Sequence, residues 1–200
     1  MMFHRSRSRG VGYSLLLVAS IAGCSYTPLS TINALRAVDP LTTPAKDMRV
    51  MVALPPAYLP QKDSVNMETQ LDATDALPAQ TYEFRLQQIP KGAAEMRVDQ
   101  GQPTYVYQIH PDDIAKFEAL RTVKDDDDRG GSLSVGVGAC LMTPEIPREA
   151  KVTIYLKTVE LQDYVILVRN ADLLEGVTPG EVAKEIPKCT ASNSVMPSTK

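Results

Sequence analysis

Short segments in which apolar and polar residues alternate recur along most of this chain, and they constrain its fold more than any other feature. The segment "TYEFRLQ" shows the pattern most cleanly, with Tyr82, Phe84 and Leu86 separated by polar residues. Successive side chains of a strand point to opposite faces of a sheet, so this alternation indicates strands with one buried face. The sequence predicts seven strands, at residues 48–54, 67–73, 81–87, 104–109, 132–142, 151–157 and 163–169.

One segment instead has the spacing of an amphipathic helix. His110 and Pro111 precede two aspartates, and proline with acidic residues in a first turn is typical of a helix N-terminus. Apolar residues then recur three positions apart and form one stripe, at Ile114, Phe117, Leu120 and Val123. Such a stripe is usually buried, so we expect this helix to pack on the sheet. A second short helix is compatible with "PGEVAKEI", at residues 179–186.

These elements predict a mainly β, α+β fold: an antiparallel, β-sandwich-like single domain with one amphipathic helix. The last three strands are expected to form a meander. In the first of them, Leu133, Val135 and Val137 share one face, whereas the other face carries only serine, glycine and Cys140. A strand face this bare invites another segment of backbone to lie close against it.

The N-terminus has the composition of a secretory signal. Three arginines, Arg5, Arg7 and Arg9, precede an apolar run from Val11 to Ala22. A membrane-spanning helix needs roughly 20 consecutive apolar residues, and this run has only about a dozen. The run is therefore too short to span a bilayer but suits the apolar region of a signal peptide.

The four residues Ile21-Ala22-Gly23-Cys24 resemble the lipobox of bacterial lipoprotein signal peptides, in which leucine is commoner at the first position. The resemblance implies cleavage before Cys24, a lipid on its thiol and an acylated amine, and several acyl chains anchor a protein stably. Among Gram-negative lipoproteins, an aspartate after the cysteine often retains the protein at the inner membrane. Ser25 stands here, which favours the periplasmic face of the outer membrane. The alternative is an ordinary secretory signal followed by a chance cysteine.

The sequence then divides into four parts. We predict a signal peptide at residues 1–23, a lipidated tether at 24–47, a β-rich periplasmic domain at 48–188 and a flexible C-terminal tail at 189–200. About 150 residues follow the tether, which is enough for one hydrophobic core.

The net charge argues against two classes of partner. The chain has 21 basic and 24 acidic residues, and removal of the signal takes three arginines and no acidic residue. The mature chain then has 18 basic residues against 24 acidic ones, a net charge of −6. An acidic protein without basic clusters is a poor candidate for binding nucleic acid or anionic lipid through its surface.

Cys140 and Cys189 are the only other cysteines once Cys24 is lipidated. In an oxidising periplasm two remaining cysteines are expected to form a disulfide. A reactive pair or a metal site is the alternative. The chain has no Cys-x-x-Cys motif, and the mature part has only one histidine.

Few residues offer catalytic or metal-binding chemistry. Asp125–Asp128 could supply oxygen ligands to calcium, but the spacing does not fit an EF-hand, and a solvated loop after the helix is the simpler interpretation. His110 lies at a helix boundary and has no catalytic partner in a known motif. No Gly-x-Ser-x-Gly elbow, Ser-x-x-Lys motif or phosphate-binding loop occurs. The tyrosines fall mostly on strand patterns, where cross-strand packing explains them.

The sequence therefore predicts a lipid-anchored, non-enzymatic binding or assembly module at the periplasmic face of a membrane. It would need no cofactor or metal, would bind the membrane through Cys24 and would contact another envelope protein, for which an exposed sheet edge could serve. The alternative is an envelope hydrolase or ligand-binding enzyme whose carboxylates are brought together by folding.

Overall fold

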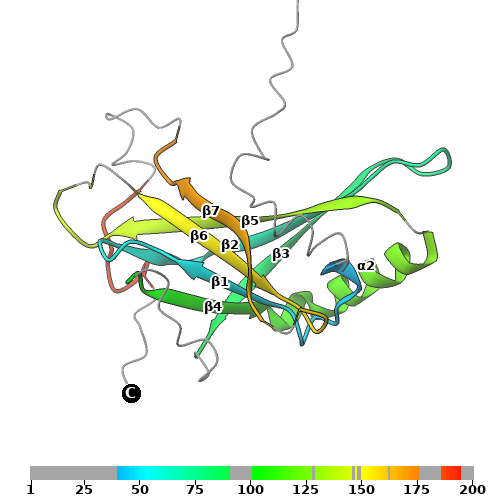
Figure 1. Ribbon diagram of the computed structural model, residues 1–200, viewed down its shortest axis with the longest axis horizontal. Helices are drawn as coiled ribbons and strands as arrows, with labels where there is room; N and C mark the ends of the chain where they lie inside the picture. Colours follow the sequence, from blue (N-terminus) through cyan, green and yellow to red (C-terminus); the bar gives the residue numbers. More distant parts are fainter. Residues whose placement is uncertain are drawn as a thin grey trace, which may run out of the picture.

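The computed structural model describes residues 40–90, 101–127, 129–145, 147, 150–161, 163–175 and 186–194. Seven strands form one antiparallel sheet in the order β5-β2-β3-β4-β1-β6-β7 (Figure 1). Their bounds are β1 Arg49–Ala53, β2 Tyr58–Leu71, β3 Gln80–Ile89, β4 Thr104–Ile109, β5 Gly131–Leu141, β6 Lys151–Lys157 and β7 Val165–Asp172. The predicted strands are confirmed, although β2 begins nine residues before the predicted start at Met67.

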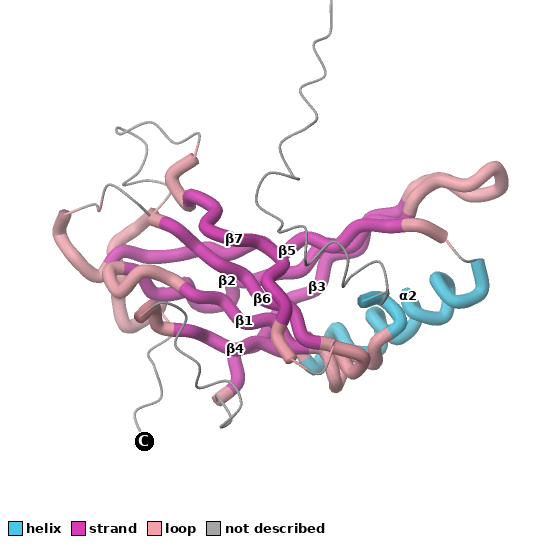
Figure 2. Tube along the Cα trace, in the orientation of Figure 1, coloured by secondary structure: helices cyan, strands magenta, loops and turns pink. Residues whose placement is uncertain are grey.

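The sheet curls into two layers because β3 changes its neighbour part-way along. Its first half pairs with β2, up to Asn66 opposite Arg85, and its second half pairs with β4, starting at Leu86 opposite Ile109. The β5-β2 end therefore turns away from the β4-β1-β6-β7 end, as the crossing magenta strands of Figure 2 show. The predicted mainly β, sandwich-like α+β class is confirmed.

One buried cluster fills the space inside the curled sheet. It takes side chains from every strand and from the helix, among them Val50, Met67, Phe84, Tyr107, Ala139, Ile154, Leu167 and Phe117. A smaller apolar row crosses the opposite face of five neighbouring strands, where Ile89, Val106, Met51, Tyr155 and Ile166 stand in register. The strands of this half of the sheet are thus apolar on both faces, which explains their nearly continuous apolar sequences.

The amphipathic helix packs on the sheet, as predicted, and lies at one end of it. A 3-10 turn, η3 Pro111–Asp113, leads into α2 Ile114–Asp127. Phe117 and Leu120 of the stripe are buried, and the Phe117 ring meets Phe84 of β3 edge-on, with ring centroids 5.2 Å apart. Ile114, at the start of the stripe, remains 38% exposed. None of the helices in the described part of the chain has the length and apolar character needed to cross a bilayer.

The predicted meander of the last three strands is wrong. Strand β5 pairs with β2 at one margin of the sheet, whereas β6 and β7 continue from β1 at the other margin. Helix α2 explains the difference, because it carries the chain away from β4 before β5 begins beside the long strand β2 (Figure 1).

The domain begins earlier than the predicted boundary at residue 48. A short 3-10 helix, η1 Pro40–Thr42, and the residues after it pack on α2, with Leu41, Ala45 and Met48 all buried. The N–H of Ala45 donates to the Glu118 carboxylate at 2.8 Å, and the Arg121 Nε donates to the carbonyl of Thr42 at 2.9 Å. The last residues assigned to the tether therefore belong to the folded domain.

Several predictions concern segments outside the described residues. The signal peptide, Cys24 and the tether up to residue 39 are among them, as are residues 179–185 of the second helix.

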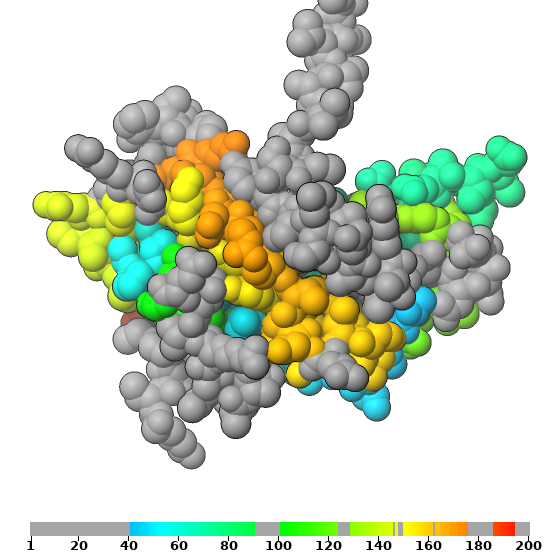
Figure 3. Space-filling model, in the orientation of Figure 1, coloured from blue at the N-terminus to red at the C-terminus, as the bar shows by residue number. Residues whose placement is uncertain are grey.

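The β2–β3 hairpin projects from the body of the domain at the end that carries α2 (Figure 3). Its residues 72–80 are all exposed.

Candidate functional site

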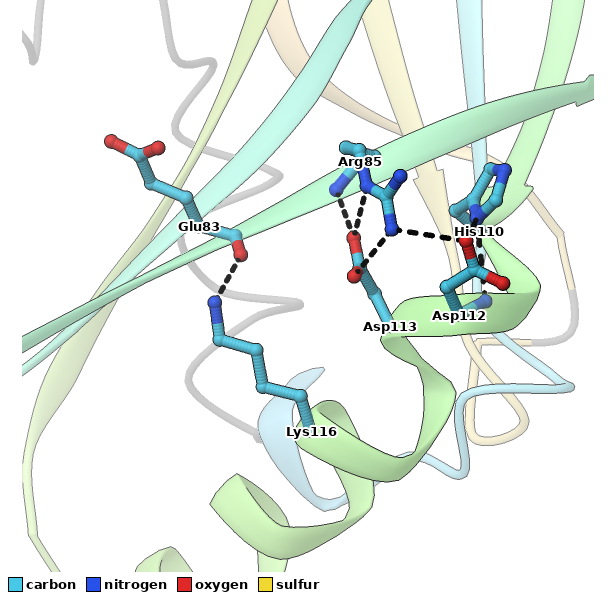
Figure 4. Close-up of polar contacts among 6 residues, drawn as sticks. All are labelled: Glu83, Arg85, His110, Asp112, Asp113 and Lys116. Atoms are coloured by element: carbon cyan, nitrogen blue, oxygen red, sulfur yellow. Dashed lines mark hydrogen bonds and ion pairs between the residues drawn. The ribbon is translucent and has the colours of Figure 1, made fainter.

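The most prominent cluster of charged side chains lies between β3 and the start of α2 (Figure 4). Arg85 donates from Nε to Asp113 at 3.1 Å and from Nη2 to the other oxygen of Asp113 at 3.0 Å. Nη2 also contacts Asp112 at 3.4 Å. Most of the Arg85 side chain is exposed, whereas only 17% of the Asp113 side chain is.

This cluster holds the helix against an otherwise open strand edge. The first half of β3 extends past the end of β4, so its outer backbone groups lack a strand partner. Asp113 accepts the N–H of Arg85 at 2.8 Å, and Lys116 donates to the carbonyl of Glu83 at 2.7 Å. The ammonium of Lys116 also lies over the Phe84 ring, 5.1 Å from its centroid. Helix side chains thus replace a neighbouring strand, which is one way that proteins protect an edge.

Hydrogen bonds lower the pKa of Asp113 in this cluster and of other carboxylates elsewhere in the domain. The hydrogen bond from Arg85 holds the pKa of Asp113 below its usual value. The hydrogen bond from the Leu174 N–H, followed by that from Lys151, lowers the pKa of Asp172. Burial acts to raise the pKa of Glu118, but hydrogen bonds from Ala45 and Arg121 outweigh it and lower that pKa. Each of these pKa values is lowered because the ionised carboxylate accepts hydrogen bonds from neighbouring groups.

His110 is a helix cap, as predicted. The Nδ1 atom of His110 accepts a hydrogen bond from the backbone N–H of Asp112 at 3.3 Å. The backbone N–H of His110 donates to the carbonyl of Arg85 at 2.9 Å.

The acidic run does not form the loop that the sequence predicted. The helix continues through Asp127, so three of the four aspartates belong to its last turns, and Asp128 lies outside the described residues. Within the described ranges, no three His, Cys, Asp or Glu residues are grouped as a metal site requires.

Two of the strand tyrosines pack in the core, as the sequence predicted. Tyr105 and Tyr107 stand opposite Val52 and Val50, and both are buried.

The predicted disulfide forms between Cys140, near the end of β5, and Cys189, with Cα atoms 4.9 Å apart. Leu141 donates its N–H to Pro187 and accepts from the N–H of Cys189, both at 2.9 Å. Further along, the N–H of Lys62 in β2 donates to the carbonyl of Asn193 at 3.1 Å. Residues 187–194 therefore cross the end of the β5-β2 pair, so the first residues of the predicted tail have defined contacts.

Side chains of β2 cover the bare face of β5 beyond Cys140. A Cβ at Gly136 would stand 2.2 Å from Oδ1 of Asn66, and one at Gly138 would stand 2.6 Å from Cβ of Ser64. The Ser64 hydroxyl also donates to the carbonyl of Gly138 at 3.0 Å. These glycines make room for the neighbouring strand's side chains rather than for a further segment of backbone.

Over most of its length, the outer edge of β5 has no strand partner among the described residues. The N–H of Asp72 donates to the carbonyl of Gly130, which fixes the residues that face β2: Ser132, Ser134 and Gly136. The backbone groups of Leu133, Val135 and Val137 must therefore point away from β2. In the described part of the chain, no strand pairs with this edge before Leu141. The segment from Gly131 to Ala139 contains no charge and no proline, the usual residues that block an edge.

Two proline substitutions test this assignment of the edge. Ser134→Pro removes an N–H that bonds to β2, so we expect it to lower the free energy of unfolding by about 2 kcal/mol. Val135→Pro removes an N–H at the free edge and part of a half-buried side chain, with an expected loss of about 1 kcal/mol or less. Urea titration of the detergent-solubilised full chain, followed by circular dichroism, measures both. Equal losses would contradict the assignment.

Comparison with models of known protein families, with curated protein sequences and with solved structures found no match. The candidate site therefore rests on geometry alone. Of the predicted site residues, Cys140 and Cys189 meet, while Cys24 is outside the described residues. The sequence did not identify which edge is free, although the uncharged composition of residues 131–139 was a usable signal.

Proposed function

We propose that this protein is a lipid-anchored, non-enzymatic binding or assembly module at the periplasmic face of the outer membrane. The observation that carries the proposal is the outer edge of β5, an uncharged strand of eleven residues. Among the residues that the structure describes, no strand pairs with this edge from Leu133 to Val137. An edge of this kind can accept a strand from another protein.

Two features support the compartment and the anchor. The Cys140–Cys189 disulfide suits an oxidising environment such as the periplasm. The sequence Ile21-Ala22-Gly23-Cys24 supplies a lipid attachment point at the start of the mature chain. The roughly 15 residues between Cys24 and η1 would give the domain room to reach partners near the membrane surface.

In-cell crosslinking with mass spectrometry tests this function, by comparing the wild type with Cys24→Ala in isolated envelopes. We expect wild-type Cys24 to carry lipid and the protein to fractionate with the outer membrane, whereas Cys24→Ala loses the lipid. We also expect one abundant crosslinked protein whose yield falls in the variant. Its crosslinks should involve Lys62 or Lys188, which flank the end of β5, more than Lys157 on β6. A lipidated, folded protein without any abundant crosslinked partner would contradict the proposal.

A further inference from the structure

The inner side of the free edge is apolar and only half covered. The side chains of Leu133, Val135 and Val137 face the core, yet all three are partly exposed because β5 is the last strand of the sheet. Met67 and Val65, the register partners of Val135 and Val137 in β2, are buried. A strand added beside β5 would cover the half-exposed row if its own inward side chains were apolar.

The outer side of the same edge adjoins two glutamates. On that face Ser134 stands opposite Glu68 of β2, and Glu68 stands opposite Glu83 of β3. Like charges directly opposite each other destabilise a sheet, and both residues are exposed. In the described part of the chain no ion pair joins either carboxylate to a cation.

Two basic side chains beside β3 already have other contacts. Arg85 bonds to Asp112 and Asp113, and Lys116 bonds to the backbone carbonyl of Glu83. Figure 4 shows the Glu83 carboxylate pointing away from Lys116. Adjacent strands lie about 4.8 Å apart, so a residue on an added strand would be about 10 Å from Glu68. A lysine or arginine side chain is long enough to reach across this distance, and the residue of β5 in between, Ser134, has a short side chain.

The geometry points to a specific kind of partner: a segment of another protein that adds to the β5 edge as a strand, with apolar side chains inward and a basic side chain outward beside Ser134. This inference rests on the proposed function and names the chemistry of the partner. A second copy of β5 fits less well, because it presents only serine and glycine on its outer face and would leave Glu68 and Glu83 without a cation.

Two fluorescein-labelled peptides of matched sequence test the inference: Thr-Val-Lys-Val-Ser-Val-Thr and Thr-Val-Glu-Val-Ser-Val-Thr, both amidated. Binding to the detergent-solubilised full chain is measured by fluorescence anisotropy. We expect the lysine peptide to bind at least about tenfold more tightly than the glutamate peptide. Hydrogen exchange with mass spectrometry should show slower exchange of the segment 131–139 when the lysine peptide is bound.

Matched variants separate the two parts of the inference. Val135→Pro removes a central donor of the edge and should weaken the lysine peptide at least about tenfold. The double variant Glu68→Gln and Glu83→Gln keeps the edge and should bring the two peptides to within about twofold of each other. As a control on the opposite side of the sheet, Arg169→Ala on β7 should leave both affinities unchanged.

Three results would overturn the inference. The first is equal affinity of the two peptides for the wild type. The second is absence of binding at roughly millimolar peptide. The third is slower hydrogen exchange of residues 131–139 that depends on the protein concentration and not on the peptide. The last result would assign the edge to a second copy. These outcomes would not contradict the proposed function, which the crosslinking experiment tests separately. If Val135→Pro cells kept the crosslinked partner, that partner would bind through a surface other than the β5 edge.

Discussion

Replacement of Cys140 and Cys189 by alanine together is expected to lower the free energy of unfolding by about 4 kcal/mol, from the chain-entropy model for a closed loop of this size. The two cysteines are 49 residues apart, and their disulfide joins β5 to the C-terminal segment. Without it, residues 187–194 are held by a few backbone hydrogen bonds, chiefly those to Leu141 and Lys62. Urea titration of the full chain measures the loss.

Reduction provides the matched control for this prediction. Dithiothreitol should lower the stability of the wild type to that of the double variant and should leave the double variant unchanged. Hydrogen exchange in residues 187–194 should become faster in both cases, and the free edge of β5 should lengthen to include Leu141. Unchanged stability of the wild type in reductant would contradict the prediction.

Arg129→Ala is expected to lower the free energy of unfolding by about 3 kcal/mol, the range for losing hydrogen bonds from a buried charged group. The residue is only 2% exposed although it lies between an acidic run and two glycines. Its Nε and Nη2 donate to the carbonyl of Asp72 at 2.9 and 2.6 Å, and Nη2 also donates to the carbonyl of Pro78 at 2.6 Å. Arg129 therefore joins the start of β5 to the projecting β2–β3 hairpin.

Two further variants distinguish this role from a general effect of charge. Arg129→Lys keeps the charge but loses the planar fork that binds two carbonyls, so its stability should lie between those of the wild type and the alanine variant. Arg169→Ala, at an exposed arginine on β7, should change stability by no more than about 0.5 kcal/mol. Similar losses for the alanine variants at both arginines would show that burial of Arg129 does not matter.

The charged cluster at the start of α2 has a structural consequence for the proposed docking edge. Strand β3 would offer a second open edge, but Asp113 and Lys116 occupy the backbone groups of Arg85 and Glu83 there. Strand β7, at the far margin, is irregular: its pairing with β6 shifts register, and Asn170 has a positive φ of 53°. The pairing of β5 with β2 also shifts register, between Pro60 and Val65, but it is continuous from Gly131 to Val137. The proposal therefore concentrates on this part of the β5 edge.

The sequence by itself determined the elements. Runs of aromatic and β-branched residues located β4 and β6 to the residue, and the proline and aspartates after His110 located the start of the helix. The count of cysteines predicted the disulfide. Each of these features depends on a few neighbouring residues or on composition, so a single sequence contains enough information to find it.

Only the tertiary structure decided how the elements pair. Alternation in β5 is the same whether the strand lies beside β6 or beside β2, so the sequence could not place it at a margin or show that its edge is free. The burial of Arg129 likewise depends on carbonyl groups more than 50 residues away in the chain. Strand order and buried polar contacts arise from interactions between distant segments, and local patterns do not record which segments meet.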